Sequence, residues 1–520
     1  MMRPSWMPSV GDIVFILLLQ FILLIIPNFI YGDGSTGWHL VTGQYILEHG
    51  QIPRSDLISY TFPDKPWVAY EWLFDAFIAG LDKIGGLKLL AVVCSSAISL
   101  LFLLLYEDCR RRGAHFFQAM TLCVMGALIS AIHWLVRPHL VTFFAVFIYS
   151  RSLQEFVEEK ISAKKLFLIL SLSMLLWVNC HPAFLMGIVM VVIYLAADFI
   201  AWICNSEKQT ADLLFKRMKV FALALLLISA STLANPYGIE LYKYILEYLH
   251  QSVVLSQNDE FSSPVFHGQL QSVLLELFYF ALALGLVSTQ KKPNLGRFLL
   301  VLAFAHLSLS ARRNMPLFVI VSLPFIAELL ANSRFNCFAG LGNARLAPWL
   351  NFLKERWLSI GRTIDETEFS CTRHAIPIAF VLLFAVSCLG DGKALGFQLI
   401  KSDFDPKNKP VDVLKCLKEK NLDEKHGLSY DNWGGYIRYK TGMRVFIDDR
   451  SDFYGEKFYL EYADAATVQS NWQQVLDKHK IDWILFPNNS LLVANLKTAA
   501  NWKLLCEDQA SCLYVRRSKD

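Results

Sequence analysis

The sequence predicts a mainly α-helical polytopic membrane protein of about eleven spans that ends in an extracytoplasmic α/β domain. Hydrophobic residues make up 54% of the 520 residues, whereas charged residues make up only 18% and collect between apolar runs of membrane-span length. Beyond about residue 410, short helical and strand-like patterns replace these runs. A soluble chain of this length would divide into several domains with charged surfaces, and the net charge of +4 does not indicate a nucleic-acid partner.

The transmembrane part is predicted from apolar runs, several of which are near or below the length of an upright spanning helix. No small-residue cleavage site follows the first run, so we interpret it as a retained span and not as a signal peptide. The eleven predicted spans are residues 12–31, 87–106, 116–136, 140–156, 166–179, 183–204, 220–234, 271–289, 298–311, 315–331 and 375–389.

Lysine and arginine lie mostly in alternate loops, and this asymmetry predicts the orientation of the chain. The basic segments are residues 110–112, 160–165, 208–219 and 291–292 and the loop 332–374, and they are predicted to lie inside the cell. An odd number of spans then places the N-terminus inside and the C-terminal domain outside the membrane.

Two long segments lie outside the predicted spans. The outer loop, residues 32–86, is expected to hold helices at 39–49 and 72–83 and an amphipathic segment on the membrane surface. The tail is expected to hold helices at 411–420, 454–465 and 471–479 and strands at 444–447, 482–486 and 513–516. The predicted domains are a transmembrane domain, 1–395, a linker, 396–409, and the α/β domain, 410–520.

The eleven cysteines are scattered singly and lack Cys-x-x-Cys spacing, so they predict no zinc site. Most of them lie within predicted spans, where cysteine behaves as a small apolar residue. Cys506 and Cys512 could pair across a hairpin if the tail faces an oxidising compartment.

Short polar motifs interrupt the apolar runs on the predicted outer side, and this pattern indicates a site because charged groups at span edges are costly. Asp33 follows the first span and could act as a general base or bind a metal, or it could cap the next helix. Glu71 is a second outer carboxylate at a helix start, where a negative charge also favours the helix. His39 could donate to a phosphate or orient Asp33, or it could be an ordinary interfacial residue.

Arginine and histidine recur at the outer ends of later spans. Arg137 and His139 flank a proline after the third span, and Arg312 and Arg313 lie at the equivalent depth after the ninth. Arginines at this depth suit the phosphate or pyrophosphate of a lipid-linked group, because they form bidentate, charge-assisted bonds. The alternative is ordinary snorkelling of the side chains to lipid headgroups.

A tight break between two apolar runs contains Asn179 and His181. Because lipid offers no hydrogen bonds, the break directs both side chains toward a protein interior or a cavity. They could bind substrate there, or they could satisfy the broken helix ends. In the tail, Trp433, Asp448 and Asp449 could contact sugar faces and hydroxyls, or they could belong to turns that follow strands.

Together these motifs resemble the GT-C superfamily of lipid-phosphate-sugar glycosyltransferases, in a poorly characterised group of bacterial polytopic proteins. Members read Asp-x-x-Thr-Trp-Trp-His-Leu-Ala-Thr-Gly after the first span, and residues 33–43 match this pattern except that Gly37 replaces the first tryptophan. Pro182 and Ala183 replace a Gly-Gly pair after the histidine of another motif. The other matching segments are residues 46–53, 59–61, 67–73, 137–139, 235–238, 312–316, 433–436 and 447–450, so the resemblance covers nearly the whole chain.

The resemblance implies a GT-C-like fold, a catalytic carboxylate at the position of Asp33 and a sugar donor carried on a polyprenyl phosphate at the outer membrane surface. Many GT-C enzymes need a divalent cation, so Mg²⁺ or Mn²⁺ is a candidate cofactor and Asp33 a candidate ligand. We therefore expect an inverting glycosyltransferase that contacts membrane lipids and has an unidentified acceptor. The alternatives are a non-catalytic protein that binds or transports a lipid-linked envelope glycan, and an assembly factor for an envelope polysaccharide.

Overall fold

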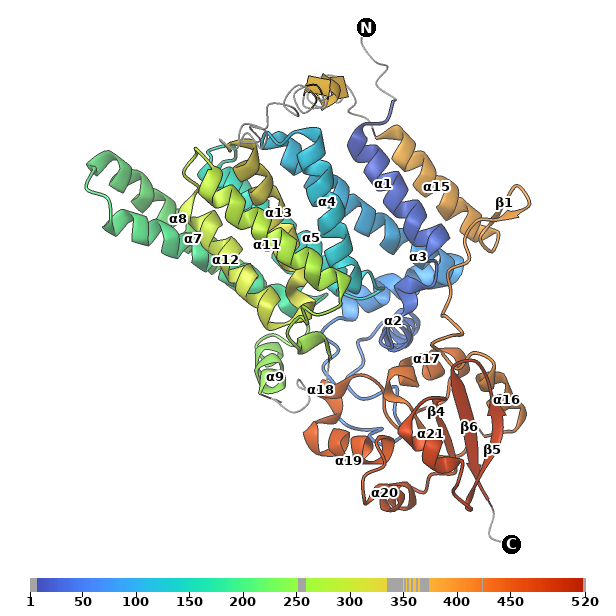
Figure 1. The fold of residues 1–520 in the computed structure, drawn as a ribbon. Helices are drawn as coiled ribbons and strands as arrows, with labels where there is room; N and C mark the ends of the chain where they lie inside the picture. The colour runs from blue at the N-terminus through green and yellow to red at the C-terminus, as the bar shows by residue number, and fades with distance from the viewer. Residues whose placement is uncertain are drawn as a thin grey trace.

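The computed structural model describes residues 7–250, 259–333, 374–422 and 424–517, together with a few single residues between 349 and 364. A bundle of long helices forms one part of the molecule, and a smaller domain that contains a β-sheet forms the other (Figure 1). The outer loop lies between these two parts, so both of them can contribute side chains to one site.

Apolar runs become helices in the bundle because a helix satisfies its own backbone hydrogen bonds. Short 3-10 turns at Ala131–His133, Pro182–Phe184 and Arg312–Asn314 lie at helix ends, and another is formed by Asp259–Phe261. The bundle and the outer loop contain the helices α1 (Val10–Gln20), α2 (Thr36–His49), α3 (Trp72–Arg111), α4 (Phe116–Ser130), α5 (His139–Val157), α6 (Ala163–Val178), α7 (Leu185–Ile203), α8 (Lys208–Ser231), α9 (Glu240–Leu249), α11 (Leu270–Ser288), α12 (Leu295–Ser310), α13 (Met315–Ala331) and α15 (Ala375–Leu389).

The protein is a polytopic membrane protein. Six described segments are long and apolar enough to cross a membrane, namely Trp72–Arg111, Phe116–His133, His139–Val157, Pro182–Ile203, Leu270–Ser288 and Arg312–Ala331. Three shorter apolar helices are Val10–Ile25, Leu295–Ser310 and Ala375–Leu389. Each of the eleven predicted spans overlaps a described helix, but the count of eleven is not confirmed, because α6 and α8 belong to neither group.

The segment α3 consists of two helices that meet at a kink, as the sequence analysis expects. Gly85 and Gly86 have non-helical backbone angles there, and they separate the predicted helix 72–83 from the predicted span 87–106. Gly86 has a φ of 64°, which glycine adopts without strain.

The smaller domain is built on a four-stranded sheet. Its strands, in spatial order, are β3 (Gly427–Ser429), β4 (Trp483–Pro487), β6 (Ser511–Arg516) and β5 (Trp502–Glu507). The strands β3 and β4 are parallel, and the other neighbours are antiparallel. A small hairpin, β1 (Lys393–Ala394) and β2 (Phe397–Gln398), precedes this domain. The domain contains α16 (Val413–Glu419), β3 (Gly427–Ser429), α17 (Asp431–Thr441), α18 (Ser451–Tyr454), α19 (Glu456–Ala466), α20 (Trp472–Lys478), β4 (Trp483–Pro487), α21 (Leu491–Leu496), β5 (Trp502–Glu507) and β6 (Ser511–Arg516).

The structure corrects three predictions for the tail. The segment 444–447 is not a strand, because Val445 forms only an isolated bridge with Ser59 of the outer loop. The expected turn around residues 431–436 is the first part of α17. Cys506 forms a disulfide with Cys416 and not with Cys512, which is free and buried. The register of β5 and β6 explains this choice, since Cys506 lies opposite Leu513.

The tail domain docks on the outer loop through a close crossing of α2 and α17. A Cβ atom at Gly37 would overlap the backbone carbonyl of Gly435, and one at Gly435 would lie 2.8 Å from the Trp38 nitrogen. The absence of a side chain at Gly37, where related motifs have tryptophan, therefore allows this contact. The helix α2 is largely buried between α3 and α17, so it is not the amphipathic surface segment expected in the outer loop.

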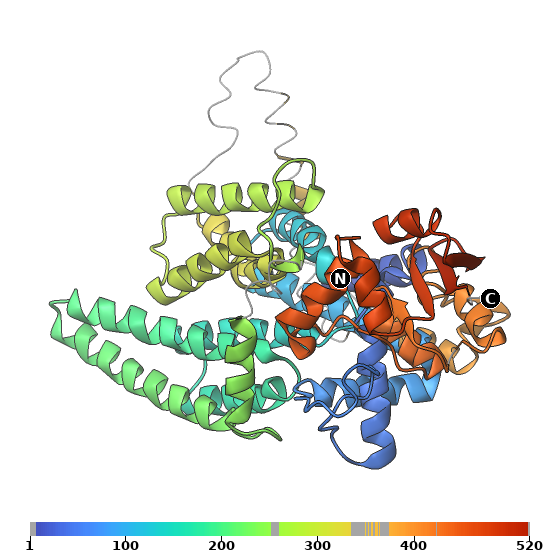
Figure 2. The same ribbon diagram turned by 90° about the horizontal axis from the view of Figure 1, so that it is seen from below.

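The two views agree on how the parts are arranged. Seen from below, the tail domain covers the side of the bundle where α2 lies, while the hairpin of α7 and α8 extends away from it (Figure 2). This hairpin exposes apolar side chains, such as Leu226 and Ile203, as expected for a surface that faces lipid.

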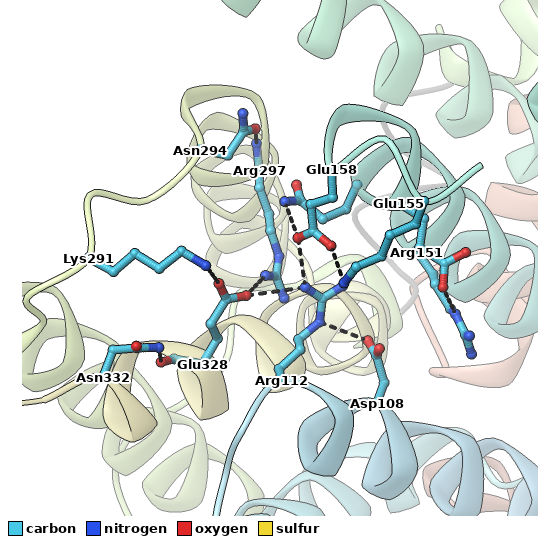
Figure 3. Close-up of polar contacts among 12 residues, drawn as sticks. Asp108, Arg112, Arg151, Glu155, Glu158, Lys291, Asn294, Arg297, Glu328 and Asn332 are labelled. Atoms are coloured by element: carbon cyan, nitrogen blue, oxygen red, sulfur yellow. Dashed lines mark hydrogen bonds and ion pairs between the residues drawn. The ribbon is translucent and has the colours of Figure 1, made fainter. Parts of the chain in front are cut away.

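A network of ion pairs joins helix ends on the other side of the bundle (Figure 3). Its centre is Glu328 of α13, which accepts hydrogen bonds from Arg112, Lys291 and Arg297. Arg112 also donates to Asp108 at 3.2 Å and to Glu158 at 3.4 Å. The network thus ties together α3, α5, α12 and α13. Because α3, α5 and α13 each begin near the candidate site, the network lies at their opposite ends.

Candidate functional site

A polar pocket lies where the outer loop, the outer helix ends and the tail domain meet. Residues from all three regions line it, so the structure brings together many of the motifs on the predicted outer side. The lining residues are Ser35, Trp38, Trp67, Val68, Ala69, Tyr70, Glu71 and Asp75 of the outer loop and α3, Arg137, His181, Pro182, Tyr248, Glu260, Phe261 and Arg313 of the bundle, and Asp449, Arg450, Ser451 and Asp452 of the tail.

Asp33 lies behind the pocket wall and holds Arg137. Its carboxylate accepts hydrogen bonds from the backbone N–H and the hydroxyl of Ser35 and lies 3.4 Å from Nε of Arg137. Burial alone would raise the pKa of Asp33, but Arg137 and Ser35 outweigh it and hold this pKa far below its usual value. Asp33 is therefore ionised and is a weak proton acceptor. Arg137 also donates to Glu260 at 2.9 Å.

Glu71 has the opposite electrostatic character. It lies at the start of α3, lines the pocket and is 9% exposed. Burial raises the pKa of Glu71 to about 8, while Arg137 partly opposes this effect. A carboxyl group with a pKa near the working pH is well suited to take and give a proton. The structure thus favours Glu71 over Asp33 as the acid–base group of this site.

His39 contacts other carboxylates than the sequence analysis suggests. Its Nδ1 atom lies 2.6 Å from Oδ1 of Asp75, and its Nε2 atom lies 4.0 Å from Oε2 of Glu71. No hydrogen bond joins His39 to Asp33 among the described contacts, so the expected orienting role toward Asp33 is not supported. The sequence analysis did not single out Asp75. The signal for Asp75 is its position one helical turn after Glu71.

The two arginines after α12 have different environments. Arg313 lines the pocket, and its guanidinium group lies 4.4 Å from the ring centre of Phe261. Arg312 does not line the pocket or the adjoining groove. His139 lines only the groove, and its Nε2 atom lies 2.6 Å from the backbone carbonyl of His133. Of the predicted phosphate-binding residues, Arg137 and Arg313 therefore reach the pocket.

The break after α6 supplies one pocket residue and one structural residue. Asn179 does not line the pocket. Its amide nitrogen donates to the carbonyls of Leu175 and Ala234, and its amide oxygen accepts from the indole of Trp72. His181 lines both the pocket and the groove.

A hydrogen-bond chain fixes the ring of His181. Its Nδ1 atom accepts from the backbone N–H of Ala183 at 3.3 Å and lies 2.9 Å from the hydroxyl of Thr142. That hydroxyl accepts from the indole of Trp177 at 2.8 Å, so its own hydrogen is directed to Nδ1. The proton of the neutral imidazole is therefore on Nε2. Burial lowers the pKa of His181, which keeps the ring neutral.

In the tail, Asp449 reaches the pocket, whereas Trp433 and Asp448 have structural roles. The indole of Trp433 donates to the Asn408 carbonyl at 2.8 Å, and Asp448 accepts two hydrogen bonds from Arg450. Asp449 is partly buried, and its Oδ1 atom is shielded from solvent and has no hydrogen-bond partner. Burial, together with the charge of Asp33, raises the pKa of Asp449.

Further pocket residues were not predicted from the sequence. Arg450 bonds to Asp56 of the outer loop at 2.7 Å, and its guanidinium group lies 4.6 Å from the ring centre of Trp67. Asp452 accepts from the hydroxyl of Tyr244 at 2.7 Å. These contacts join the tail to the bundle across hundreds of residues, and no local pattern in the sequence indicates them.

An apolar groove opens from the polar pocket. It has a volume of about 340 Å³ and shares Glu71, Arg137, His181 and Arg313 with the pocket. Its apolar wall comes from α5, α7, α9 and α13 and consists of Phe143, Leu185, Met186, Ile245, Leu249 and Leu317. The site thus combines cations and a titratable carboxyl group with a surface suited to a hydrocarbon chain.

The acidic residues of the site partly fit a divalent cation. Asp33 and Asp449 repel one another, and the unpartnered oxygen of Asp449 is the kind of ligand that Mg²⁺ prefers. Lys409, whose pKa burial lowers to about 8, is attracted to both carboxylates. Within the described residues, no group of three or more His, Cys, Asp or Glu side chains is arranged to hold a metal.

Comparison with known proteins finds similarity in structure but not in sequence. No family model and no curated sequence matches the chain. Among solved structures, the apo oligosaccharyltransferase of Archaeoglobus fulgidus aligns with a TM-score of 0.54 and 14% identity over 93% of this chain and 70% of that one. The AglB oligosaccharyltransferase of the same organism, in complex with an inhibitory peptide and a dolichol-phosphate, aligns with a TM-score of 0.55 and 14% identity. This alignment covers 98% of this chain and 74% of that one.

A second enzyme aligns over its whole length. ArnT from Cupriavidus metallidurans bound to undecaprenyl phosphate has a TM-score of 0.52 and 12% identity, over 98% of this chain and 97% of that chain. AglB and ArnT are both GT-C glycosyltransferases. At these identities the likeness establishes the fold alone. The chain therefore has the GT-C fold that its sequence motifs predict.

Proposed function

We propose that the protein is a membrane glycosyltransferase that moves a sugar from a polyprenyl-phosphate donor to an extracytoplasmic acceptor. The observation that carries this proposal is the continuity of the polar pocket with the apolar groove through Arg137, His181 and Arg313. A lipid-phosphate sugar has matching parts in the same order: a polar sugar, an anionic phosphate and an apolar chain. The complexes of AglB with dolichol-phosphate and of ArnT with undecaprenyl phosphate support this donor class.

The donor phosphate would lie between the cations at the junction. Arg137 and Arg313 offer charge-assisted hydrogen bonds, and His181 offers the N–H of its Nε2 atom. Asp33 fixes Arg137 in place. The first isoprene units would lie along Leu317 and its neighbours in the groove, and the sugar would extend toward the tail.

The reaction inverts the anomeric carbon in this proposal. The bond from that carbon to the phosphate oxygen breaks, and the acceptor oxygen or nitrogen forms the new bond. Arg137, Arg313 and His181 stabilise the charge that develops on the leaving phosphate. Glu71 takes the proton of the acceptor, and Asp449 and Arg450 hold polar groups of the sugar or the acceptor. The acceptor is a glycan, a lipid or a protein.

A divalent cation belongs to the proposal as a candidate cofactor. Asp33 and Asp449 would hold it, and its charge would add to the stabilisation of the leaving phosphate. The proposed location is the bacterial inner membrane, with the N-terminus inside and the tail outside. The disulfide between Cys416 and Cys506 supports an oxidising surrounding for the tail.

The experiment is a donor assay with purified protein in detergent. A panel of polyprenyl-phosphate sugars is offered with and without Mg²⁺ or Mn²⁺, and the release of free polyprenyl phosphate is measured. We expect release with one donor class, a loss of about 100-fold or more in Glu71→Gln, and a loss in Asp33→Asn because Arg137 loses one of its two carboxylate partners. Lipid binding without release from any donor would contradict the proposal and favour a binding or transport protein.

A further inference from the structure

Three buried side chains form a row at the pocket wall. Glu71 and Asp75 both line the pocket, and the ring of His39 lies between their carboxyl groups. The side chains of His39 and Asp75 are each 1% exposed, and that of Glu71 is 11% exposed. The row is therefore shielded from water except at its Glu71 end.

The fold fixes this row through the contact of α2 with α3. Glu71 and Asp75 lie one helical turn apart at the start of α3, so both face α2. Gly43 follows His39 by one turn of α2, and a Cβ atom at Gly43 would overlap the backbone carbonyl of Asp75. The absence of that side chain lets the two helices approach until His39 lies between the two carboxyl groups.

The position of the proton in the row depends on the tautomer of His39. The Nδ1 atom of His39 lies 2.6 Å from Oδ1 of Asp75, and in the Nδ1–H tautomer this N–H donates to the carboxylate. The Nε2 atom then presents a lone pair to Glu71 at 4.0 Å. Catalytic hydrogen bonds are often long before substrate binds and shorten in the complex. The second oxygen of Asp75 is buried and has no hydrogen-bond partner.

We propose that Asp75 and His39 are positioning residues that accept and hold the proton of Glu71 while Glu71 acts on the acceptor; this inference rests on the proposed function. Glu71 holds a proton at neutral pH and cannot take another one. Its proton moves to Nε2 of His39, and the carboxylate that results takes the proton of the acceptor. Asp75 stabilises the imidazolium through the Nδ1 hydrogen bond.

The proton balance of this step is complete. The acceptor loses one proton to Glu71, Glu71 loses one to His39, and the electron pair of the broken carbon–oxygen bond leaves with the phosphate. When the product departs, His39 returns its proton through Glu71 to the pocket and then to solvent.

Other charged groups face the row and determine its charge. Burial raises the pKa of Glu71, Arg137 and Arg313 oppose this effect, and Asp452 adds to it. Burial lowers the pKa of His39, Arg137, His139 and Arg450 add to this effect, and Asp33 opposes it. An imidazolium at His39 is therefore short-lived, and the hydrogen bond from Nδ1 to Asp75 favours it. The same arginines favour the ionised form of Glu71 once its proton has moved.

The first test follows the protonation of His39 without any substrate. The ¹⁵N signals of His39 are assigned by their loss in His39→Gln and are titrated in the wild type, in Glu71→Gln and in Asp75→Asn. We expect both carboxyl variants to move the transition by at least about one pH unit, because each removes one end of the row. Thr42→Ala, a buried change on the same helix, is expected to leave it in place. If the pH midpoint of the His39 titration is unchanged in both carboxyl variants, the inference is overturned.

The second test measures the pH dependence of donor turnover. In His39→Gln, Glu71 must lose its proton to solvent, so the acidic limb of the kcat profile is expected to move up toward pH 8. In Asp75→Asn, kcat is expected to fall about 100-fold, with KM changed less than about twofold. A uniform loss with an unchanged pH profile would show a merely structural role and overturn the inference. Absence of turnover in the wild type contradicts the proposed function. The titration of His39 still tests whether its protonation is coupled to Glu71 and Asp75.

Discussion

Arg312 and Arg313 are adjacent in sequence, but only Arg313 lines the pocket and the groove. Replacing Arg313 with glutamine removes a charge at the proposed phosphate position, and we expect donor turnover to fall about 100-fold. Arg312→Gln is the matched control and should stay within about twofold of the wild type. Turnover with purified donor checks both values. Equal effects of the two changes would show that the charge acts at the lipid surface and not in the pocket.

The raised pKa of Glu71 also has a consequence for stability. Its pKa rises from an ordinary 4.5 to about 8 on folding, so the folded protein binds this proton more tightly than the unfolded one. The stabilisation is complete below pH 4.5 and is lost as the pH rises through 8. We expect the Tm of the wild type to fall more between pH 5 and pH 9 than that of Glu71→Gln. Parallel Tm curves for the two proteins would show that the pKa is not raised.

At the scale of elements, the crossing of α2 and α17 depends on glycine. We expect Gly37→Ala to separate the two backbones and to destabilise the docking of the tail by about 1–3 kcal/mol. Gly80→Ala on α3 is the control, because a Cβ atom at Gly80 would have no other atom within 4 Å and a helix favours alanine. Proteolysis near residues 396–409 should become faster only in Gly37→Ala. Equal rates would show that the crossing does not hold the tail.

The ion-pair network at the other helix ends allows a second comparison. Glu328→Gln leaves Arg112 and Arg297 without their shared carboxylate, and we expect a loss of about 3–5 kcal/mol in stability. Glu155→Gln removes only a part-exposed pair with Arg151, which is worth about 0.3–0.5 kcal/mol. Figure 3 shows both groups. A Tm of Glu328→Gln similar to that of Glu155→Gln would contradict the central role of Glu328.

At the scale of the whole molecule, the sequence predicts what local patterns determine. Hydropathy places a helix in every predicted span, and the motifs place Glu71, Arg137, His181 and Arg313 in one pocket. It does not predict Asp75 as a partner of His39, because that contact depends on how α2 packs on α3. The strand prediction at 444–447 is wrong for the same reason, since these residues bridge to the outer loop instead of extending the sheet.

The orientation of the whole molecule in the membrane can be tested by labelling a native cysteine. Cys204, between α7 and α8, is exposed, whereas the other free cysteines of the described residues are buried. In a background with Cys337 and Cys371 changed to serine, a membrane-impermeant maleimide should label Cys204 only after the inner membrane is opened. Lys503→Cys, at an exposed position of β5, should be labelled in intact spheroplasts. Because the pocket is closed by tail residues, the reverse pattern would place the site and its acceptor inside the cell.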